Sequence, residues 1–587
     1  MLSFWYTLLL VGLVGAKRPN ILFIMTDDQD LHMTPPATFM PHVEQSIVKE
    51  GATFATHFCT VALCCPSRAT LWTGRAAHNT NVTDVAPPYG GYPKVVAEGW
   101  NDNNLFLWMQ SAGYNTYYTG KLWNAHTTQN YDSPYARGFN GSDFLLDPYT
   151  YQYDNAVMTR NGGRPVSYKG NYSTDVVAKK ASGFLKEAMS HDEPWFLAVA
   201  PIAPHTTNRL DSLTNTNWFG PPLPAPRHAD LFKNFTVKRD KSFNVPIEGA
   251  PAWPGRLSVL NDTIIAYQDE FQRLRLQSLQ AVDEMVGALV KQLDDAGVLN
   301  NTYVFYTTDN GYHVSQHAMM PGKYCGYDTD IHIPLYVRGP GIEAGSVLNA
   351  VTTHTDLAPT ILNIAEAPLD PHFDGQPIPF DEEKAKDFPV EHATIEYWGY
   401  AIGEGDYGWK NISGRNINVF LGNSYKSVRI VSKDYSLYYS VWCTNEAELY
   451  DLKTDPLQTK NLLGTNVTTE TPFTIADRGI EQIVHRLDAL TMVLKSCKGK
   501  VCKEPWHYLH PGGKVKTLTD ALATTYDAFY ANQPKVSYKL CLFGYNMKNE
   551  GPQVANVYDA GAMKTDTERE TLERRDIDYG DSFHLWT

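Results

Sequence analysis

Three short apolar runs, each followed closely by polar residues, constrain the fold of this chain most strongly. Residues 20–25, 195–200 and 303–307 are almost uninterrupted apolar or aromatic segments, a pattern typical of strands buried on both faces of a parallel sheet. Polar residues follow each run. Because open α/β sheets hold ligands just beyond the carboxyl ends of their strands, we expect these side chains to meet at one edge. They are Asp27, Asp28, His205, Asp309 and Asn310.

The segments between and after these runs predict an α/β architecture. Residues 263–299 carry apolar side chains at helical spacing, residues 335–341 read as a further strand with a turn, and residues 356–365 read as a helix. Strands that alternate with helices favour a mixed or mainly parallel sheet covered on both faces.

A stretch rich in proline and acidic residues, 369–391, indicates a domain boundary. We therefore expect a catalytic domain over residues 17–375 and a smaller α+β domain over residues 390–587. Within the second domain, residues 428–431 and 435–439 are typical of antiparallel strands. A chain of 587 residues is long enough for one large and one smaller domain.

The chain start and the composition bear on compartment and partners. Residues 1–16 form an apolar run that ends in small residues and predicts a signal peptide cut after Ala16, although its first residues lack Lys and Arg; a first core strand is the alternative. No later run has the length of a membrane span. The formal net charge of -14 opposes nucleic-acid binding, so an anionic substrate requires a local cationic cluster.

Glycosylation signals and cysteines also fit the secretory pathway. Cys497 with Cys502 and Cys443 with Cys541 are the most economical disulfide pairs, although connectivity does not follow from sequence, and no Cys/His group has zinc-ligand spacing. Eight Asn-x-Ser/Thr sequons predict surface glycans at Asn81, Asn140, Asn171, Asn234, Asn261, Asn300, Asn411 and Asn466.

The residue types at the strand ends indicate a metal site. Asp27, Asp28, Asp309 and Asn310 offer only oxygen ligands, which suits a hard divalent cation such as Ca²⁺, with Mg²⁺ as the second choice. An Asp-Asp pair alone would indicate a capped turn at a helix start. The order of both pairs around the motif described next makes the metal site the better interpretation.

Residues 64–75, Cys-Cys-Pro-Ser-Arg-Ala-Thr-Leu-Trp-Thr-Gly-Arg, resemble the signature of the type I sulfatases, in which the first cysteine is oxidised to formylglycine. The alternative, a purely structural role, is that Cys64 and Cys65 are buried or disulfide-linked cysteines in a turn. Residues 448–456 resemble a turn motif of the smaller sulfatase domain. The resemblance implies an alkaline-phosphatase-like fold and makes Cys64 the modified residue, which depends on a formylglycine-generating or other sulfatase-modifying enzyme.

The same resemblance implies roles for further residues. In the family, positions matching Asp27, Asp28, Asp309 and Asn310 hold a cation that also touches the formylglycine at Cys64. Residues 113–121 resemble the segment that carries an active-site lysine, here Lys121, and many members follow this lysine with Trp-His where this chain has Leu-Trp-Asn. The remaining matches are Arg68, which steadies the diol and the aspartates, His205 near the leaving group, Lys323 as the second sulfate-binding lysine and His313, which either reaches the substrate or packs.

The resemblance is greatest to secreted fungal arylsulfatases and N-acetylglucosamine-6-sulfatases. It favours hydrolysis of small aryl sulfate esters by an extracellular or vacuolar-lysosomal enzyme. The first alternative is an exo-sulfatase acting on 6-sulfated N-acetylglucosamine, and the second is a phosphonate or phosphodiester hydrolase of the same fold. A catalytically dead carbohydrate-binding relative would have lost a metal ligand or the cysteine, and this chain keeps all of them.

Overall fold

The computed structural model describes residues 17–211, 216–408, 411–412, 415–416, 419–465, 467 and 472–559. The predicted signal peptide, residues 1–16, and the sequon at Asn466 lie outside this part, as does the side chain of Asn411. Five of the other six sequon asparagines are exposed and Asn81 is half-buried. In the part of the chain that the structure describes, no helix has both the length and the apolar character needed to cross a membrane.

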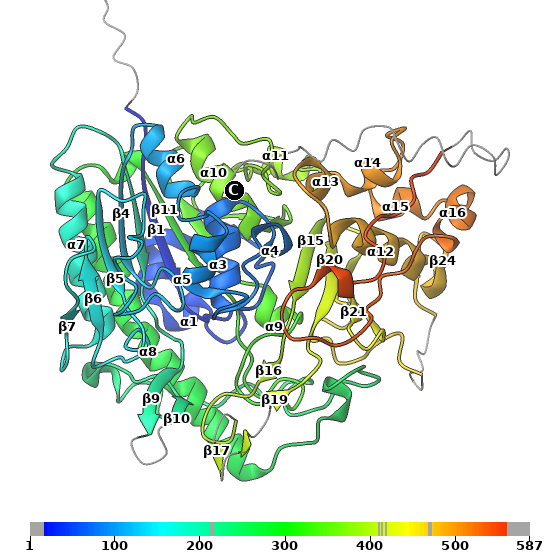
Figure 1. Cartoon of the computed structure of the whole chain (residues 1–587), viewed down its shortest axis with the longest axis horizontal. Coiled ribbons are helices and arrows are strands. Elements are labelled where there is room, and N and C mark those ends of the chain that lie inside the picture. The colour runs from blue at the N-terminus through cyan, green and yellow to red at the C-terminus, as the bar shows by residue number, and fades with distance from the viewer. Residues whose placement is uncertain are drawn as a thin grey trace, which may run out of the picture.

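A ten-stranded mixed sheet forms the centre of the larger part of the molecule (Figure 1). The strands β11, β1, β8, β4 and β5 are parallel neighbours, and strands with antiparallel partners flank them. The predicted mixed sheet is thus confirmed. In spatial order the strands are β13 (Ser346–Leu348), β2 (Ala52–Phe54), β12 (Leu335–Arg338), β11 (Thr302–Thr308), β1 (Asn20–Thr26), β8 (Trp195–Ala200), β4 (Asn115–Gly120), β5 (Gly141–Leu145), β6 (Val157–Arg160) and β7 (Val166–Ser167).

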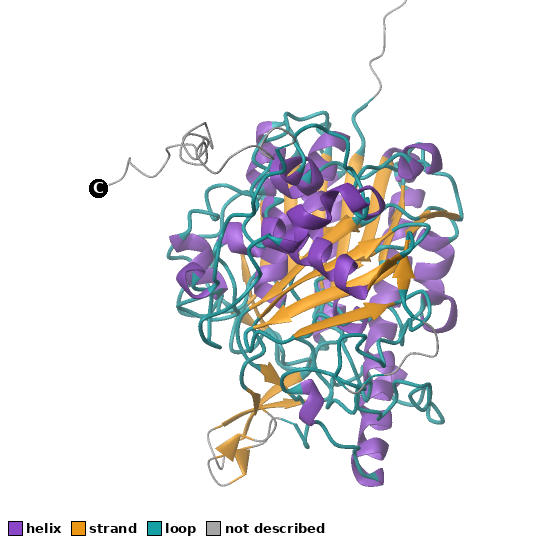
Figure 2. Ribbon diagram, turned by 90° about the vertical axis from the view of Figure 1, so that its right-hand side faces the viewer, coloured by secondary structure: helices purple, strands orange, loops and turns teal. Residues whose placement is uncertain are grey.

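The central strand β1 shows why the apolar runs are continuous. Side chains alternate between the two faces of a strand. Phe23 therefore packs into one core cluster together with Trp72 of α3 (Cys64–Thr73). Leu22 packs into another cluster together with Val282 of α8 (Asp262–Asp295). Helices lie on both sides of the sheet (Figure 2). Both faces of β1 are buried, which is why its central residues 21–25 are all apolar.

The two helical layers consist of segments far apart in sequence. One layer contains α7 (Ser173–Ala188) and the 34-residue α8 (Asp262–Asp295). The side chain of Asn261 caps the N-terminus of α8 by accepting a hydrogen bond from the backbone N–H of Ile264. The other contains α3 (Cys64–Thr73), α5 (Gly91–Ala97), α6 (Leu105–Ser111) and α10 (Leu357–Ile364). The predicted helices over 263–299 and 356–365 correspond to α8 and α10.

A four-stranded antiparallel sheet follows the acidic, proline-rich stretch. Its order is β15 (His392–Tyr397), β20 (Tyr425–Val431), β21 (Ser436–Trp442) and β22 (Ala447–Asp451), and α12 (Ile480–Leu494) packs against it. The two predicted strands are therefore confirmed within β20 and β21. Both predicted disulfides, Cys443–Cys541 and Cys497–Cys502, are also confirmed.

The two sheets share a core. One cluster of buried residues joins Phe58 and Ile331 of the larger part to Tyr438 and Trp442 of β21. The C-terminal sheet also holds the loop that carries Lys323, because the carbonyl of Tyr324 accepts hydrogen bonds from Asn423 and from the hydroxyl of Tyr425. The smaller sheet therefore helps to place a residue of the site described below.

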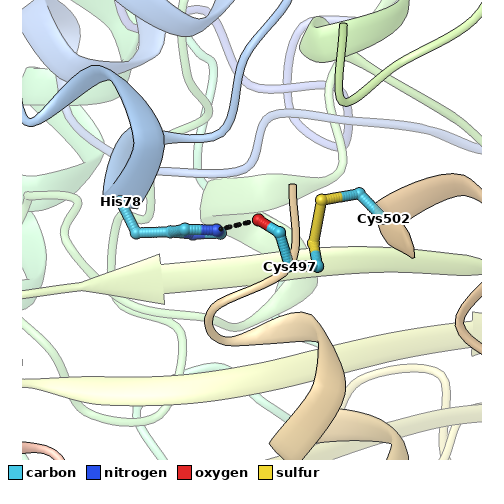
Figure 3. Close-up of side chains that lie close together, drawn as sticks. All are labelled: His78, Cys497 and Cys502. Atoms are coloured by element: carbon cyan, nitrogen blue, oxygen red, sulfur yellow. Dashed lines mark hydrogen bonds between the residues drawn. A yellow bond between two sulfur atoms is a disulfide. The ribbon is translucent and has the colours of Figure 1, made fainter. Parts of the chain in front are cut away.

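Buried contacts of His78 close the junction between the two parts, among them the hydrogen bond with the carbonyl of Cys497 (Figure 3). His78, in α4 (Ala77–Thr80), contacts Glu396 of β15 through Nδ1 at 2.8 Å and the carbonyl of Cys497 through Nε2 at 2.9 Å. Lys426 of β20 donates to the same carboxylate at 2.7 Å. Burial lowers the pKa of His78, but the charge and hydrogen bond of Glu396, together with Asp374, raise it above its usual value and favour the charged imidazolium.

Candidate active site

The polar residues at the strand ends meet at one edge of the sheet, as predicted. Lys121 follows β4, and its ammonium lies 2.6 Å from Asp27 Oδ2, just beyond β1. Asp309 follows β11 and accepts the backbone N–H of Asp28 at 3.1 Å. His205 follows β8, and its Nε2 lies 3.5 Å from Asp28 Oδ2. Four neighbouring strands therefore supply one buried cluster.

Asp28 adopts a backbone conformation that few side chains tolerate. Its φ is +65°, in the left-handed region, where Asp and Asn are enriched among residues other than Gly. The amide of Asn310 donates to Asp28 Oδ1 at 2.8 Å, and Arg275 of α8 donates to the Asp28 carbonyl at 2.7 Å. Asn310 therefore holds the carboxylate of Asp28, and Arg275 holds the main-chain carbonyl of the same residue.

Cys64 is the first residue of α3 and lies between the carboxylates and a lysine. Its Sγ is 3.4 Å from Asp27 Oδ1, 3.9 Å from Asp28 Oδ1 and 3.0 Å from Lys323 Nζ. Burial and the negative charge of Asp27 raise the pKa of the thiol well above its usual range, although Lys121 and Lys323 oppose this. An unmodified Cys64 is therefore a protonated thiol, which is a weak nucleophile.

Three buried cations balance the carboxylates. Arg68 donates through Nε to Asp309 Oδ2 at 2.9 Å and lies 3.4 Å from Asp27 Oδ2. Lys323 contacts Asp28 Oδ1. Burial lowers the pKa of both lysines, but the negative groups around each lysine together outweigh burial and raise the pKa, with Asp27 the strongest of them at Lys121 and Asp28 the strongest at Lys323. The site therefore keeps its positive charges at neutral pH.

The carboxylates remain ionised for the same reason. Burial alone raises the pKa of Asp27, but Lys121, His205 and Arg68 together lower it to about 2. Lys323 is the main cause of a lowered pKa at Asp28, again against burial. The cluster is thus a preorganised set of charges shielded from water, in which electrostatic interactions are stronger than at a surface.

The oxygen atoms in this cluster fit a divalent cation. Asp28 Oδ2 and Asn310 Oδ1 are buried and have no hydrogen-bond partner among the described residues. Ligand atoms of Asp27, Asp28, Cys64 and His205 all lie within 4.8 Å of one another. Buried polar atoms without partners are costly unless a ligand or ion satisfies them. Asp27, Asp28, Asp309 and Asn310 are therefore a suitable oxygen-rich ligand set.

Two other groups of metal-binding residue types do not share this character. The sulfurs of Cys497 and Cys502 are joined in a disulfide beside His78 (Figure 3), so they cannot bind a metal as thiolates. His313 binds the Asp330 carboxylate through Nδ1 at 2.8 Å. The structure thus pairs His313 with Asp330. Among the described residues, its side chain forms no hydrogen bond or ion pair with Cys64 or the strand-end carboxylates.

The family resemblance predicts a histidine shortly after Lys121, and the sequence offers Asn124 and His126 in this region without a clear equivalent. Asn124 donates to the hydroxyl of Tyr151 at 2.7 Å. His126, the other nearby polar residue, lies against the rings of Tyr92 and Phe144, 4.4 Å and 5.5 Å away between centroids. His126 is therefore part of an aromatic core, and Asn124 belongs to the wall of the site.

Sequence reasoning missed two residues that contact this cluster. Arg275 lies on the inward face of α8 and is fully buried, at the position four residues before Leu279 on the apolar stripe. An arginine on such a stripe is a recognisable signal. Tyr151 stacks on His205, with ring centroids 4.1 Å apart. It lies in a loop among several tyrosines, where the sequence carries no comparable signal.

Comparisons with known proteins agree with this geometry. The Sulfatase family profile matches residues 19–367. The chain is 38% identical over 568 residues to an arylsulfatase of Volvox carteri, which covers 92% of this chain and 84% of that protein. It is 31% identical over 516 residues to the human N-acetylglucosamine-6-sulfatase, which covers 84% of this chain and 87% of that protein.

Solved structures share the fold at lower identity. One is a complex of a protein with its substrate D-glucosamine-2-N,6-O-disulfate, with a TM-score of 0.60 and 22% identity; it covers 76% of this chain and 94% of that one. A phosphonate monoester hydrolase of Agrobacterium radiobacter has a TM-score of 0.53 and 19% identity, covering 76% of this chain and 92% of that one. At these identities the likeness shows the fold alone.

Proposed function

The chain belongs to the sulfatase family, and from that premise we propose that it hydrolyses aryl sulfate esters through a formylglycine formed at Cys64. It is a sulfuric ester hydrolase with the alkaline-phosphatase-like fold. One observation carries the proposal: Cys64 Sγ lies within 3.4 Å of both Lys323 Nζ and Asp27 Oδ1. The modified side chain would stand where cationic groups and metal ligands converge.

We assign the metal site to Asp27, Asp28, Asp309 and Asn310 and the ion to Ca²⁺, with Mg²⁺ as the alternative. The two buried oxygen atoms without partners, Asp28 Oδ2 and Asn310 Oδ1, support this assignment. A bound divalent cation supplies charge neutralisation for the sulfate and lowers the pKa of an adjacent hydroxyl. Arg68 contributes by fixing Asp27 and Asp309.

A hydrated formylglycine at position 64 supplies two hydroxyls on one carbon, one for attack on sulfur and one for the later release of sulfate. Lys121 and Lys323 are placed to bind the sulfate oxygens, since their ammonium groups flank Cys64 and both stay charged. They hold the ester in line for attack and stabilise the charge that develops, an effect worth several kcal/mol per group.

His205 is the proposed proton donor to the leaving oxygen. Its Nδ1 lies 2.8 Å from the carbonyl of Thr206, so Nδ1 donates a hydrogen bond there and Nε2 faces Asp28. A proton held on Nε2 is needed most by a poor leaving group, because such an oxygen carries the most negative charge as its bond to sulfur breaks. Asp28 or a histidine then takes the proton of the second hydroxyl.

Aryl sulfates are the proposed substrates because two algal arylsulfatases, from Volvox carteri and Chlamydomonas reinhardtii, each cover 92% of the chain. The second candidate is 6-sulfated N-acetylglucosamine, supported by the 31% identity to the human enzyme. Hydrolysis of 4-nitrophenyl sulfate, N-acetylglucosamine 6-sulfate and phenyl phosphonate, measured side by side, separates the candidates. A kcat/KM highest for the aryl sulfate supports the proposal; one highest for the sugar or the phosphonate overturns it.

We also propose that the protein passes through the secretory pathway to an extracellular or vacuolar-lysosomal destination, where a sulfatase-modifying enzyme has already acted. The exposed sequon asparagines, for example Asn171 and Asn234, and the two disulfides support this route. Peptide mapping after glycosidase treatment of protein from a eukaryotic host tests it. Glycan at the exposed sequons is expected, and unmodified asparagine at all of them would contradict it.

A further inference from the structure

The loop residue Tyr151 makes three contacts inside the active site. Its ring lies nearly parallel to the imidazole of His205, with centroids 4.1 Å apart and an interplanar angle of 21°. The ammonium of Lys121 lies 4.8 Å from the centroid of the same ring. The hydroxyl accepts a hydrogen bond from Asn124 at 2.7 Å, and the residue is only 7% exposed. One side chain therefore touches two of the residues assigned to sulfate chemistry.

The backbone around Tyr151 also holds the segment that carries His205. The carbonyl of Tyr151 accepts from the hydroxyl of Thr207 and from the backbone N–H of Asn208, both at 3.1 Å. Two residues further on, the hydroxyl of Tyr153 donates to the carbonyl of His205 at 2.7 Å. Three hydrogen bonds to main-chain carbonyls thus join residues 151–153 to residues 205–208. They fix the backbone of Tyr151 relative to the backbone of His205.

We infer that Tyr151 is a positioning residue: its ring fixes the plane of the His205 imidazole, and Asn124 anchors that ring through the hydroxyl. This inference rests on the proposed role of His205. A histidine side chain has two torsions, χ1 and χ2, and the terminal one, χ2, which turns the imidazole plane, has a broad energy minimum. The hydrogen bond from Nδ1 to Thr206 limits it on one side, and the stacked ring blocks rotation out of the plane.

The fixed plane matters for one bond change. As the bond from sulfur to the leaving oxygen breaks, its electron pair passes to that oxygen, and the proton on His205 Nε2 forms the new O–H bond. Sulfur meanwhile gains its bond to the attacking hydroxyl oxygen, whose O–H bond breaks as its proton passes to a carboxylate beside position 64. Proton transfer requires Nε2 within hydrogen-bond reach and in line. A His205 ring free to rotate spends less time in that geometry, which penalises substrates whose leaving group needs the proton.

The position of the Tyr151 ring also gives Asn124 a role in the site. The amide of Asn124 is the donor that holds the Tyr151 hydroxyl, and a histidine at this position would present a different donor geometry. The contact of Lys121 with the ring adds a cation–π interaction. Asn124 therefore acts on the site through Tyr151.

The test compares two substrates whose leaving groups differ in basicity, 4-nitrophenyl sulfate and phenyl sulfate, using the modified, calcium-loaded full-length enzyme. For each variant the measured quantity is the ratio of kcat/KM for the two substrates. This ratio does not depend on the fraction of active protein, so a variant that folds or is modified poorly is still informative. The variants are Tyr151→Leu, Tyr151→Phe, Asn124→Ala and His205→Asn, with Tyr303→Leu as the control.

Tyr303 is a matched control because its ring stacks on Phe380 at 5.7 Å and its hydroxyl donates to a backbone carbonyl outside the cluster. Tyr151→Leu should lower the phenyl sulfate value about tenfold to hundredfold more than the 4-nitrophenyl sulfate value, since general acid catalysis is worth roughly 10²–10⁴. Asn124→Ala should shift the ratio in the same direction by a smaller factor. Tyr151→Phe keeps the ring but removes the same hydrogen bond as Asn124→Ala, so it should shift the ratio by a similarly small factor. Tyr303→Leu should leave the ratio within about threefold.

An unchanged ratio in Tyr151→Leu together with a shifted ratio in His205→Asn would overturn the positioning role and leave His205 as the donor. An unchanged ratio in His205→Asn would instead defeat the proposed donor itself, and with it this inference. A shift in Tyr303→Leu equal to that in Tyr151→Leu would show that loss of any stacked tyrosine changes the ratio, and would also overturn the role of Tyr151.

Discussion

Replacing Lys323 with methionine removes a buried cation from the centre of the site without removing its aliphatic stem. The ammonium contacts Asp28 and Cys64, and the residue is 2% exposed. The carboxylate of Asp28 then keeps the amide of Asn310 and longer contacts with His205 and with Cys64 Sγ. Removing one partner of a buried ion pair costs about 3–5 kcal/mol, because the other charge is left uncompensated.

The loss converts into a change of melting temperature. Unfolding entropy is about 2.1 cal/mol/K per residue, so the roughly 350 residues over which the family profile matches unfold with about 0.7 kcal/mol/K. A loss of about 3–5 kcal/mol therefore lowers Tm by about 4–7 °C in the absence of calcium. Saturating calcium places positive charge beside the same carboxylate, so we expect less than about half of this loss to remain.

The assay is differential scanning calorimetry with and without calcium, and Lys426→Met is the matched control. Lys426 is equally buried and lies 2.7 Å from Glu396, in the C-terminal sheet. Its loss should lower Tm to a similar extent but independently of calcium. Lys323→Met should also lower kcat/KM about 10²–10³-fold. An equal calcium response in both variants, or an unchanged kcat/KM in Lys323→Met, would refute the reasoning.

Three further predictions concern the surrounding structure. Glu396 raises the pKa of His78 against burial, so the stability that charged His78 contributes is complete below about pH 6.5 and is lost as pH rises through the raised pKa. His78→Gln should therefore show its largest Tm deficit near pH 5.5. A Tm deficit that grows toward pH 9 would contradict this. Removing Cys443–Cys541, which closes a separation of 98 residues, should cost about 4–5 kcal/mol, against about 2 kcal/mol for Cys497–Cys502 with its separation of 5; chemical denaturation of the double serine variants tests the order, and a reversed order refutes it. Arg275→Met removes the donor to the Asp28 carbonyl and leaves Asp30 without its ion pair, so calcium affinity measured by isothermal titration should fall at least about tenfold; unchanged affinity would remove Arg275 from the metal site.

The sequence predicted the parts of the site that repeat a simple rule of α/β sheets. β1 reads as a strand buried on both faces because all of its side chains meet one helical layer or the other. Asp27 and Asp309 follow neighbouring parallel strands, so their meeting was predictable from the runs alone. The spacing of residues 64–68 then located Cys64 and Arg68 between them.

Other features depend on contacts that no local pattern encodes. His313 is paired with Asp330, seventeen residues away, which the sequence left open between substrate contact and packing. Tyr151 and Arg275 reach the cluster from a loop and from the middle of α8. Their roles follow from where the segments pack in three dimensions. The apolar stripe of α8 marks Arg275 as a buried cation but does not say which carboxylate or carbonyl it meets. The domain limits, the signal peptide and the individual site roles remain predictions.

The central claim is that Cys64 is converted to formylglycine and that the converted protein cleaves sulfate esters. The most direct measurement is a mass spectrum of the tryptic peptide containing position 64, together with release of sulfate from 4-nitrophenyl sulfate by the same preparation and by Cys64→Ala. The account predicts an aldehyde at position 64, turnover by the modified protein and none by the variant, with the fold retained. Turnover by a protein whose Cys64 is an unmodified thiol, or by Cys64→Ala, would contradict it.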